Sequence, residues 1–228
     1  MRQIVLDTET TGLELSEGHR IIEIGCVELL HRRPSGRTWH RYVKPEREVE
    51  AGALAVHGIT NEFLASQPRF AEIAGEFLEF IAGCELVIHN APFDVGFLDS
   101  ELARTETGKT IAEHCTVLDT LALARRMHPG QRNSLDALCK RYSVDNSSRD
   151  LHGALLDARI LTDVYLAMSG GQAALSLHSE PAAAGPAREA SRLTARGKLE
   201  IPVIRPSAEE LAEHEKLMAT IARASTKH

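Results

Sequence analysis

The chain has 228 residues, a formal net charge of −6, 43% hydrophobic residues and 25% charged residues. That length suits one domain of ordinary size with an appendage, or two small domains, and the composition is normal for a soluble protein. No apolar run approaches the roughly 20 residues of a membrane-spanning helix, and Met1 leads directly into a strand-like segment. We therefore expect a cytoplasmic protein without signal peptide or membrane span, whose four widely spaced cysteines are reduced.

Acidic residues dominate the body of the chain. Residues 181–228 have a net charge of +2, which leaves −8 for residues 1–180. A protein that binds nucleic acid by itself usually presents a basic surface to the phosphates. Bound divalent cations or a basic partner could reverse the sign at a site, so charge alone leaves nucleic-acid binding open.

Strand-like and helical patterns alternate through residues 1–168. Strands are predicted at 4–6, 21–30 and 38–43, and the tight connections between them favour antiparallel neighbours. Apolar periodicity predicts further helices and strands, in the order helix 70–81, strand 86–88, helix 95–102, strand 117–118 and helices 119–127, 134–142 and 153–168. Together they predict an α/β fold, with a mixed sheet flanked by helices.

The first group of chemically interesting residues is Asp7-Thr8-Glu9, at the end of the first predicted strand. Side chains two apart on a strand point the same way, so the two carboxylates would converge. Their repulsion is relieved by a hard divalent cation with oxygen ligands. The alternative is a turn in which Asp7 only caps local N–H groups.

Two later segments place further acidic residues beside predicted element ends. Asp94 follows the strand 86–88 and falls in the first turn of the next helix, with Pro92 suited to the helix start. An acidic residue there could equally serve only the helix dipole. His152 and Asp157 precede and enter the last helix, and they converge only if His152 lies in the loop before it. A lone loop histidine could also be merely solvated.

These motifs, Asp7-x-Glu9, Asn90-Ala91-Pro92-Phe93-Asp94 and His152-x4-Asp157, resemble the three exonuclease motifs of the DnaQ-like DEDDh family. Order and spacing agree as well, and the segment His57-Gly58-Ile59-Thr60 has its counterpart between the first two motifs. The resemblance covers residues 4–168. It implies a ribonuclease H-like fold, a mixed five-stranded sheet flanked by helices, followed by a flexible C-terminal tail.

The resemblance also implies roles for individual residues. Asp7, Glu9, Asp94 and Asp157 would hold two Mg²⁺ or Mn²⁺ ions. His152 would accept the proton of the attacking water, since an ordinary histidine is largely neutral at pH 7–8. The substrate would be a DNA strand, cleaved from its 3′ end to release nucleoside 5′-monophosphates. Its contacts would be Asp7, Glu9, Thr10, Gly12, Leu13, Val56, His57, Asn90, Phe93 and Asp157.

The segment after residue 170 separates kinds of exonuclease. Gln172, Leu175 and Leu177 resemble the Q-x-x-L-x-L/F peptide that bacterial polymerases insert into the sliding clamp, although a simple helix extension reads equally well. Residues 179–206 are predicted to be a flexible linker. Ser207 and Glu210 form an S-x-x-E capping box before a helix with one apolar stripe, which favours docking on a partner.

This arrangement is similar to the epsilon proofreading subunits of bacterial DNA polymerase III. We expect an exonuclease domain at 1–170, a clamp-binding peptide at 171–178, a linker at 179–206 and a helical segment at 207–228 that binds the polymerase alpha subunit. A small theta-like partner fits the same family, but no sequence feature tests for it. The alternatives are a stand-alone exonuclease acting on RNA or single-stranded DNA, and a non-catalytic tether between polymerase and clamp.

Overall fold

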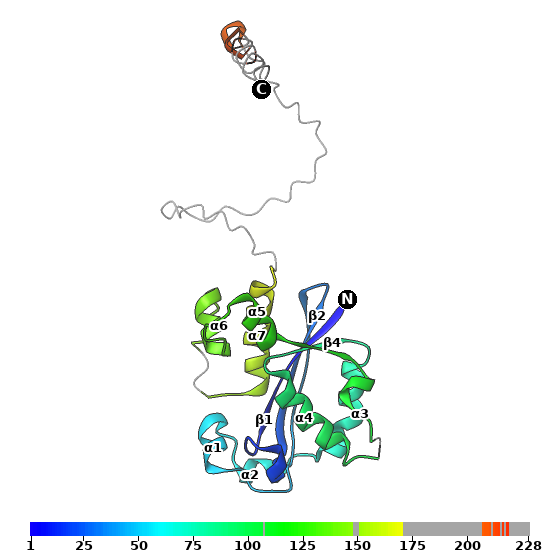
Figure 1. Ribbon diagram of the computed structural model, residues 1–228. Coiled ribbons are helices and arrows are strands. Elements are labelled where there is room, and N and C mark those ends of the chain that lie inside the picture. The colour runs from blue at the N-terminus through cyan, green and yellow to red at the C-terminus, as the bar shows by residue number, and fades with distance from the viewer. Residues whose placement is uncertain are drawn as a thin grey trace, which may run out of the picture. The chain divides into compact units, whose positions relative to one another are not determined.

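A mixed sheet of five strands forms the centre of the computed structural model, which describes residues 1–106, 108–147, 151–170, 207–210, 212–214, 216 and 218. The chain falls into two units, Met1–Ser176 and Leu177–His228. The first unit holds the sheet, with strand order β3-β2-β1-β4-β5. Figure 1 labels β1, β2 and β4 among these strands. Its strands are β1 (Arg2–Thr10), β2 (Ile21–Leu30), β3 (Arg33–Tyr42), β4 (Glu85–Ile88) and β5 (Thr116–Asp119). β1 to β3 are antiparallel, while β4 and β5 continue parallel to β1, which confirms the predicted fold class.

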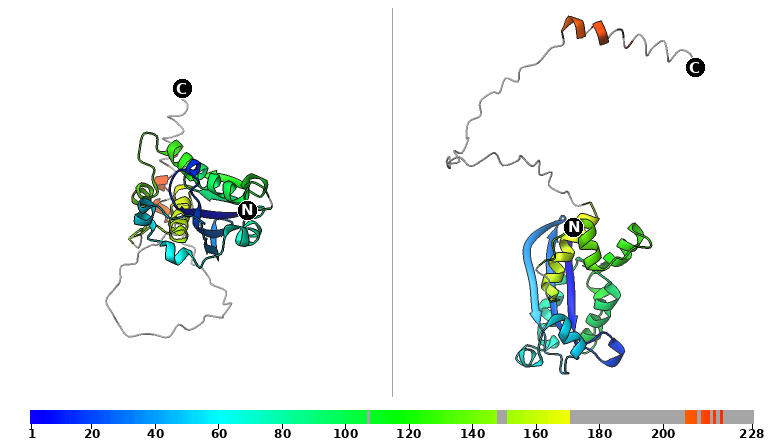
Figure 2. Two further views of the ribbon diagram at one scale, coloured as in Figure 1. Left: turned by 90° about the horizontal axis from the view of Figure 1, so that it is seen from below. Right: turned by 90° about the vertical axis from the view of Figure 1, so that its left-hand side faces the viewer.

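The side chains of β1 alternate between two hydrophobic cores, one on each face of the sheet. Ile4 and Leu6 pack on the face covered by α3 (Phe70–Ile81) and α4 (Ala91–Leu102). Val5 packs on the other face, with α5 (Thr120–Met127), α6 (Leu135–Tyr142) and α7 (Ala154–Met168). Figure 2 shows from two further sides that helices cover both faces. Burial on both faces explains why β1 begins as a continuous apolar run.

β1 extends farther than the short strand predicted at 4–6. It runs to Thr10 because its ladder with β2 continues, pairing Asp7 with Gly25 and Glu9 with Glu23. The ladder with β4 is much shorter and ends at Val5 and Val87. Asp7 and Glu9 therefore lie on the strand itself, not in a turn after it, beyond the last residue pair that β1 shares with β4.

The predicted helices at 70–81, 95–102, 119–127, 134–142 and 153–168 are confirmed, with α4 beginning earlier, at Ala91. Four short helices were not predicted: η1 (Leu15–Glu17), α1 (Ala51–His57), α2 (Asn61–Leu64) and η2 (Ile111–Glu113). α1 buries only His57, so its sequence lacks the apolar period of a core helix. It ends at Gly58, which adopts φ 70° in the left-handed region that glycine tolerates best.

In the second unit, the predicted capping box is formed. The Ser207 backbone N–H donates to Glu210 Oε2 at 2.7 Å, and the Glu210 N–H donates to Ser207 Oγ at 3.2 Å. Residues 208–210, 212–214, 216 and 218 are helical and exposed. The predicted clamp peptide with Gln172, Leu175 and Leu177, and the predicted linker 179–206, lie outside the described residues. Among the described helices, none has the length and apolarity to cross a membrane.

Candidate active site

The five residues predicted from the three motifs line a single cavity of about 180 Å³. They come from three places in the fold: β1, the start of α4, and the junction that leads into α7. The complete lining is Asp7, Thr8, Glu9, His89, Asn90, Phe93, Asp94, Leu135, His152 and Asp157. Four carboxylates that are up to 150 residues apart in sequence thus meet at one end of the sheet.

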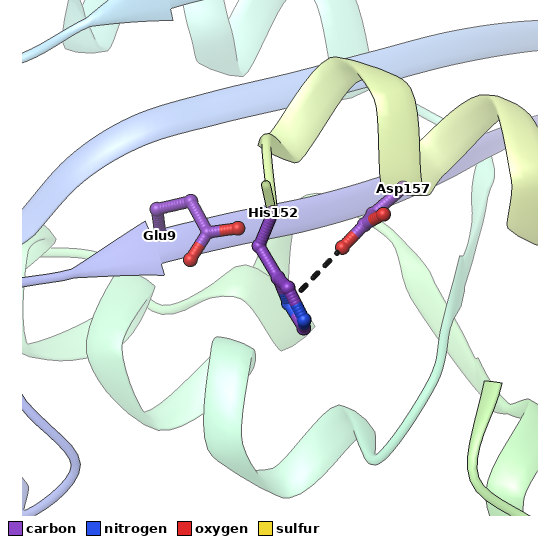
Figure 3. A group of neighbouring side chains, drawn as sticks. All are labelled: Glu9, His152 and Asp157. Atoms are coloured by element: carbon purple, nitrogen blue, oxygen red, sulfur yellow. Dashed lines mark ion pairs between the residues drawn. The ribbon is translucent and has the colours of Figure 1, made fainter. Parts of the chain in front are cut away.

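Glu9, His152 and Asp157 form the tightest group in this cavity. One potential ligand atom from each lies within 4.8 Å of the others, and Figure 3 shows Glu9 and Asp157 on either side of the His152 ring. His152 Nδ1 is 3.5 Å from Asp157 Oδ2. Asp157 is 2% exposed, whereas the histidine side chain is 44% exposed. The histidine therefore lies in the loop before α7, as predicted, where it can reach both the carboxylates and solvent.

A buried glutamate that the sequence reading did not single out holds the His152 loop. Glu23 Oε2 accepts a hydrogen bond from the Ala154 backbone N–H at 3.1 Å, at the start of α7. Its other oxygen, Oε1, lies 2.7 Å from His40 Nε2. The His152 N–H donates to the Val56 carbonyl at 3.1 Å. Glu23 thus satisfies an N–H that α7 leaves unpaired, and the only signal in sequence was an acidic residue inside an apolar strand.

Close backbone contact also sets the position of α7. A Cβ atom on Gly25 would lie 2.2 Å from the Leu155 nitrogen and 2.3 Å from the Ala154 carbonyl carbon. Gly25 is the β2 partner of Asp7 in the sheet. The absence of a side chain at this position therefore lets the first turn of α7 approach the sheet beside the Asp7 strand, which brings Asp157 into the cavity.

Asp94 enters the cavity from the other side of β1. Asn90 precedes α4 with φ 68°, and Pro92 lies in the first turn as predicted. Asp94 is 3% exposed, and the Thr8 hydroxyl donates to its Oδ1 at 2.7 Å. Burial raises the pKa of the Asp94 carboxyl to about 7, and the nearby charge of Asp119 adds to the increase, although the Thr8 hydrogen bond opposes it. At this pKa, ionisation of Asp94 is favoured by a neighbouring positive charge.

The donor set fits hard divalent cations. Four carboxylates in one small cavity offer the oxygen ligands that Mg²⁺ and Mn²⁺ prefer. Burial of Asp94 without a cation favours its neutral form, as expected for a ligand whose charge is stabilised only by metal. A second group, Glu17, His19 and Glu50, has similarly close ligand atoms elsewhere, but two of its members are exposed.

A second cavity adjoins the first at Glu9. It has a volume of about 280 Å³ and is lined by Glu9, Thr10, Gly12, Leu13, Glu50, Gly52, Ala53, Val56 and His57. We call it the terminal cavity. Six of the residues predicted to contact substrate line it: Glu9, Thr10, Gly12, Leu13, Val56 and His57. Asn90 and Phe93 line the first cavity, of about 180 Å³, instead. That first cavity is called the catalytic cavity below.

His57 brings a defined polar atom to the terminal cavity. Its Nδ1 accepts a hydrogen bond from the Ile59 N–H at 3.0 Å, so the ring proton is on Nε2. That Nε2 is buried and makes no hydrogen bond of normal geometry within the described part of the chain, although the Thr10 backbone lies close enough to interact with the ring. Burial lowers the pKa of His57, so the ring is neutral at pH 7. A buried donor without a partner is costly, and a ligand with an acceptor atom would satisfy it.

Comparisons with known proteins agree with this geometry. Residues 4–165 match a family model described as exonuclease, of the RNase T type. The DNA polymerase III subunit epsilon of Salmonella typhimurium is 51% identical over 229 residues, covering 97% of this chain and 94% of the relative. The subunit of Escherichia coli is 52% identical over 221 residues, covering 94% and 90%.

Solved structures extend the likeness to the fold. Exonuclease X in complex with 5′ overhanging duplex DNA aligns with a TM-score of 0.57 and 26% identity, covering 75% of this chain and 92% of that one. A zinc-bound form of the E. coli exonuclease I complex with single-stranded DNA has a TM-score of 0.62 at 17% identity, covering 75% and 41%.

Proposed function

The chain belongs to the family of DNA polymerase III epsilon subunits, and from this we propose that it is the proofreading 3′–5′ exonuclease of a bacterial replicative polymerase. Its activity as an exonuclease of DNA replication follows from the family. Removal of mismatched 3′-terminal nucleotides is the finer proposal. The observation that supports the proposed exonuclease activity is that one cavity is lined by Asp7, Glu9, Asp94, His152 and Asp157.

We propose that the four carboxylates bind two Mg²⁺ or Mn²⁺ ions. When bound, such ions stabilise the attacking and leaving oxygens of an in-line displacement at phosphorus. The protein's part is to hold its carboxylates in place: β1 fixes Asp7 and Glu9, α7 fixes Asp157, and Thr8 fixes Asp94. Removal of divalent cations with EDTA is expected to stop turnover.

His152 is proposed to accept the proton of the attacking water. It lies in a loop beside solvent, with Asp157 3.5 Å from Nδ1 to orient the ring and stabilise the imidazolium that forms. The hydrolysis breaks the bond between phosphorus and the 3′ oxygen of the preceding nucleotide. A nucleoside 5′-monophosphate leaves, and the shortened strand keeps a 3′ hydroxyl.

The terminal nucleotide is proposed to enter the terminal cavity. Leu13 is 77% exposed and Val56 is 44% exposed, so both present apolar surface to a base or sugar. The Nε2 proton of His57, which makes no hydrogen bond of normal geometry within the described residues, can then be donated to an acceptor on the nucleotide. A frayed, mismatched end reaches this cavity more easily than a paired end because fewer base pairs must first open.

Assignment of partners rests on the family and on the tail. We propose that 207–228 binds the polymerase alpha subunit, that Gln172, Leu175 and Leu177 bind the sliding clamp across a linker at 179–206, and that a theta-like protein can bind domain 1–170. The exposed, capped helix that includes Glu210 supports the first of these.

The test is a 3′-mismatch excision assay with the full chain, with and without its cognate polymerase subunit, in Mg²⁺ or Mn²⁺. The expected result is faster release of a mismatched than of a paired 3′ nucleotide, and stimulation by the polymerase. Asp7→Ala should abolish turnover while circular dichroism shows an intact fold. Faster cleavage of RNA than of DNA would favour a stand-alone ribonuclease, and wild-type protein without any cation-dependent turnover would leave only a tether.

A further inference from the structure

The catalytic cavity opens into a larger one of about 590 Å³. The two share His89, Asn90, Leu135 and His152. The terminal cavity shares only Glu9 with the catalytic cavity, and nothing with the larger one. The three cavities therefore form a series with the catalytic one in the middle. The larger cavity is called the upstream groove below.

The upstream groove has a lining suited to an anion. Arg125, exposed in the last turn of α5, is its cationic residue, and Gln131 and Asn133 add amide groups. Ser134 and Leu135 place the start of α6 in the same wall. Helix starts carry unpaired N–H groups and a partial positive charge that favour phosphate. An arginine and a helix start facing one groove make a phosphate site in an otherwise acidic protein.

Hydrogen bonds from Arg141, on α6, hold the loop that lines the groove. Arg141 Nη1 donates to Asn133 Oδ1 at 2.9 Å, and its Nη2 donates to Gln131 Oε1 at 3.0 Å and to the Arg132 carbonyl at 2.9 Å. The buried Asn133 Nδ2 donates to the carbonyls of His128 and Gln131. Arg141 thus takes up the oxygen of each amide side chain, which leaves the Gln131 NH₂ group as the donor that side chain can present to the groove.

Asp136 is the one acidic residue of the groove lining. It accepts a hydrogen bond from Asn146 Nδ2 at 3.2 Å, toward the loop that follows α6. Arg125, by contrast, takes part in no ion pair within the described residues. Its guanidinium is therefore available to an incoming anion. Asp136 lies in the first turn of α6 and keeps its negative charge, because its hydrogen bond comes from a neutral amide, so Arg125 must supply most of the attraction for phosphate.

We propose that Arg125 and the start of α6 bind a phosphate of the substrate strand on the 5′ side of the scissile bond. The inference rests on the proposed function and deepens it, because it gives the direction of the strand: terminal nucleoside in the terminal cavity, scissile phosphate in the catalytic cavity, preceding nucleotides in the upstream groove. Arg125 is a binding residue for the strand and has no part in the chemical step.

The test compares two substrates with the same scissile bond. The dinucleotide TpT has a single phosphate, the scissile one, whereas (dT)₁₀ has phosphates upstream of it. For Arg125→Gln we expect kcat/KM on (dT)₁₀ to fall about tenfold, as for loss of a charged hydrogen bond, and kcat/KM on TpT to stay at the wild-type value. Arg126→Gln is the matched control, since it removes the same charge from the next exposed residue of α5, and it should leave both substrates unchanged.

Salt dependence gives a second measurement. One lost phosphate contact should flatten the slope of log kcat/KM on (dT)₁₀ against log salt by about 0.7. Binding of fluorescent (dT)₁₀ in Ca²⁺, measured in parallel, reports on the groove without turnover and should weaken to a similar extent.

Three results would overturn the assignment: an unchanged rate and affinity on (dT)₁₀, an equal loss on TpT, or an equal loss in Arg126→Gln. The first result would show that Arg125 does not contact the strand. The second would place Arg125 at the scissile phosphate. The third would show that Arg125 acts only through the overall charge of α5. If wild-type protein cleaves neither substrate, the proposed function fails instead, and the binding measurement still decides whether the groove takes the strand.

Discussion

The two sides of the catalytic cavity hold equally buried carboxylates in different surroundings. On the α7 side, Asp157 is 2% exposed and lies beside His152, a group that can carry a positive charge. On the α4 side, Asp94 is 3% exposed and receives a hydrogen bond from the neutral hydroxyl of Thr8. Burial raises the pKa of Asp94 to about 7. Without a cation, burial of Asp94 therefore favours its neutral form.

This difference separates two tasks within one cavity. By the proposed function, the α7 side carries the group that accepts a proton. The α4 side carries a metal ligand, Asp94, whose neutral form is favoured until a cation binds. At pH values below about 7, cation binding at Asp94 must displace a proton. Metal affinity is therefore expected to weaken as the pH falls, mainly through the α4 side.

On the α7 side, a large effect on turnover is expected from His152→Ala. Turnover should fall by at least ~10²-fold, within the range that general bases contribute, while Mn²⁺ affinity changes little because all four carboxylates remain. Single-turnover rates and Mn²⁺ titrations of the same preparation measure the two properties. A variant with the wild-type rate would show that His152 is not the base, and one that no longer binds Mn²⁺ would move it into the ligand set.

On the α4 side, Asp94→Asn is expected to stabilise the metal-free protein while it removes activity. The folded-state pKa of about 7 lies above the ordinary 3.8, so wild-type stability declines as the pH rises from about 4 to about 7. The asparagine does not ionise and avoids that loss. Urea unfolding in EDTA should give a gain of up to about 4 kcal/mol at pH 8, at ~1.36 kcal/mol per pKa unit, and little difference at pH 4. An equal gain at both pH values would mean that ionisation of Asp94 is not the cause.

The smallest effect is expected from Thr8→Val, which removes only the hydroxyl that supports Asp94. Because that hydrogen bond lowers the Asp94 pKa, its loss should raise the pKa further and move the acidic limb of the activity profile to higher pH. We expect kcat/KM at pH 8 to fall only several-fold, as for one hydrogen bond. Thr8→Ser, which keeps a hydroxyl, should retain the wild-type profile. Identical profiles for Thr8→Val and wild type would remove Thr8 from the account.

The sequence predicted those parts of the fold that depend on local pattern. The strand at 21–30 and the helix at 70–81 agree with the structure at both ends, because the strand is a nearly continuous apolar run and the helix keeps one apolar period throughout. The site residues came from motif order and spacing through the family resemblance. Their meeting in one cavity is a property of the three-dimensional fold, which three separate motifs do not contain by themselves.

Contacts between distant residues were beyond the sequence reading. The Thr8–Asp94 hydrogen bond spans 86 residues, and the Glu23–Ala154 hydrogen bond spans 131. In neither pair does the residue type at one position predict which residue is its partner. The extension of β1 to Thr10 was missed for a similar reason, because it is set by the β2 ladder and not by apolar residues in β1 itself. α1 was missed because its exposed helix has no apolar stripe.

By the proposed function, a mutation at Gly25 would affect the accuracy of DNA replication in the cell. A methyl group there would overlap the backbone of Ala154 and Leu155. Even alanine would therefore push α7, and with it Asp157, away from Asp7 and Glu9 on β1. All five residues of the site would remain unchanged in such an allele. By the proposed function, a bacterium that carries it would accumulate replication errors, and a survey of site residues alone would class it as normal.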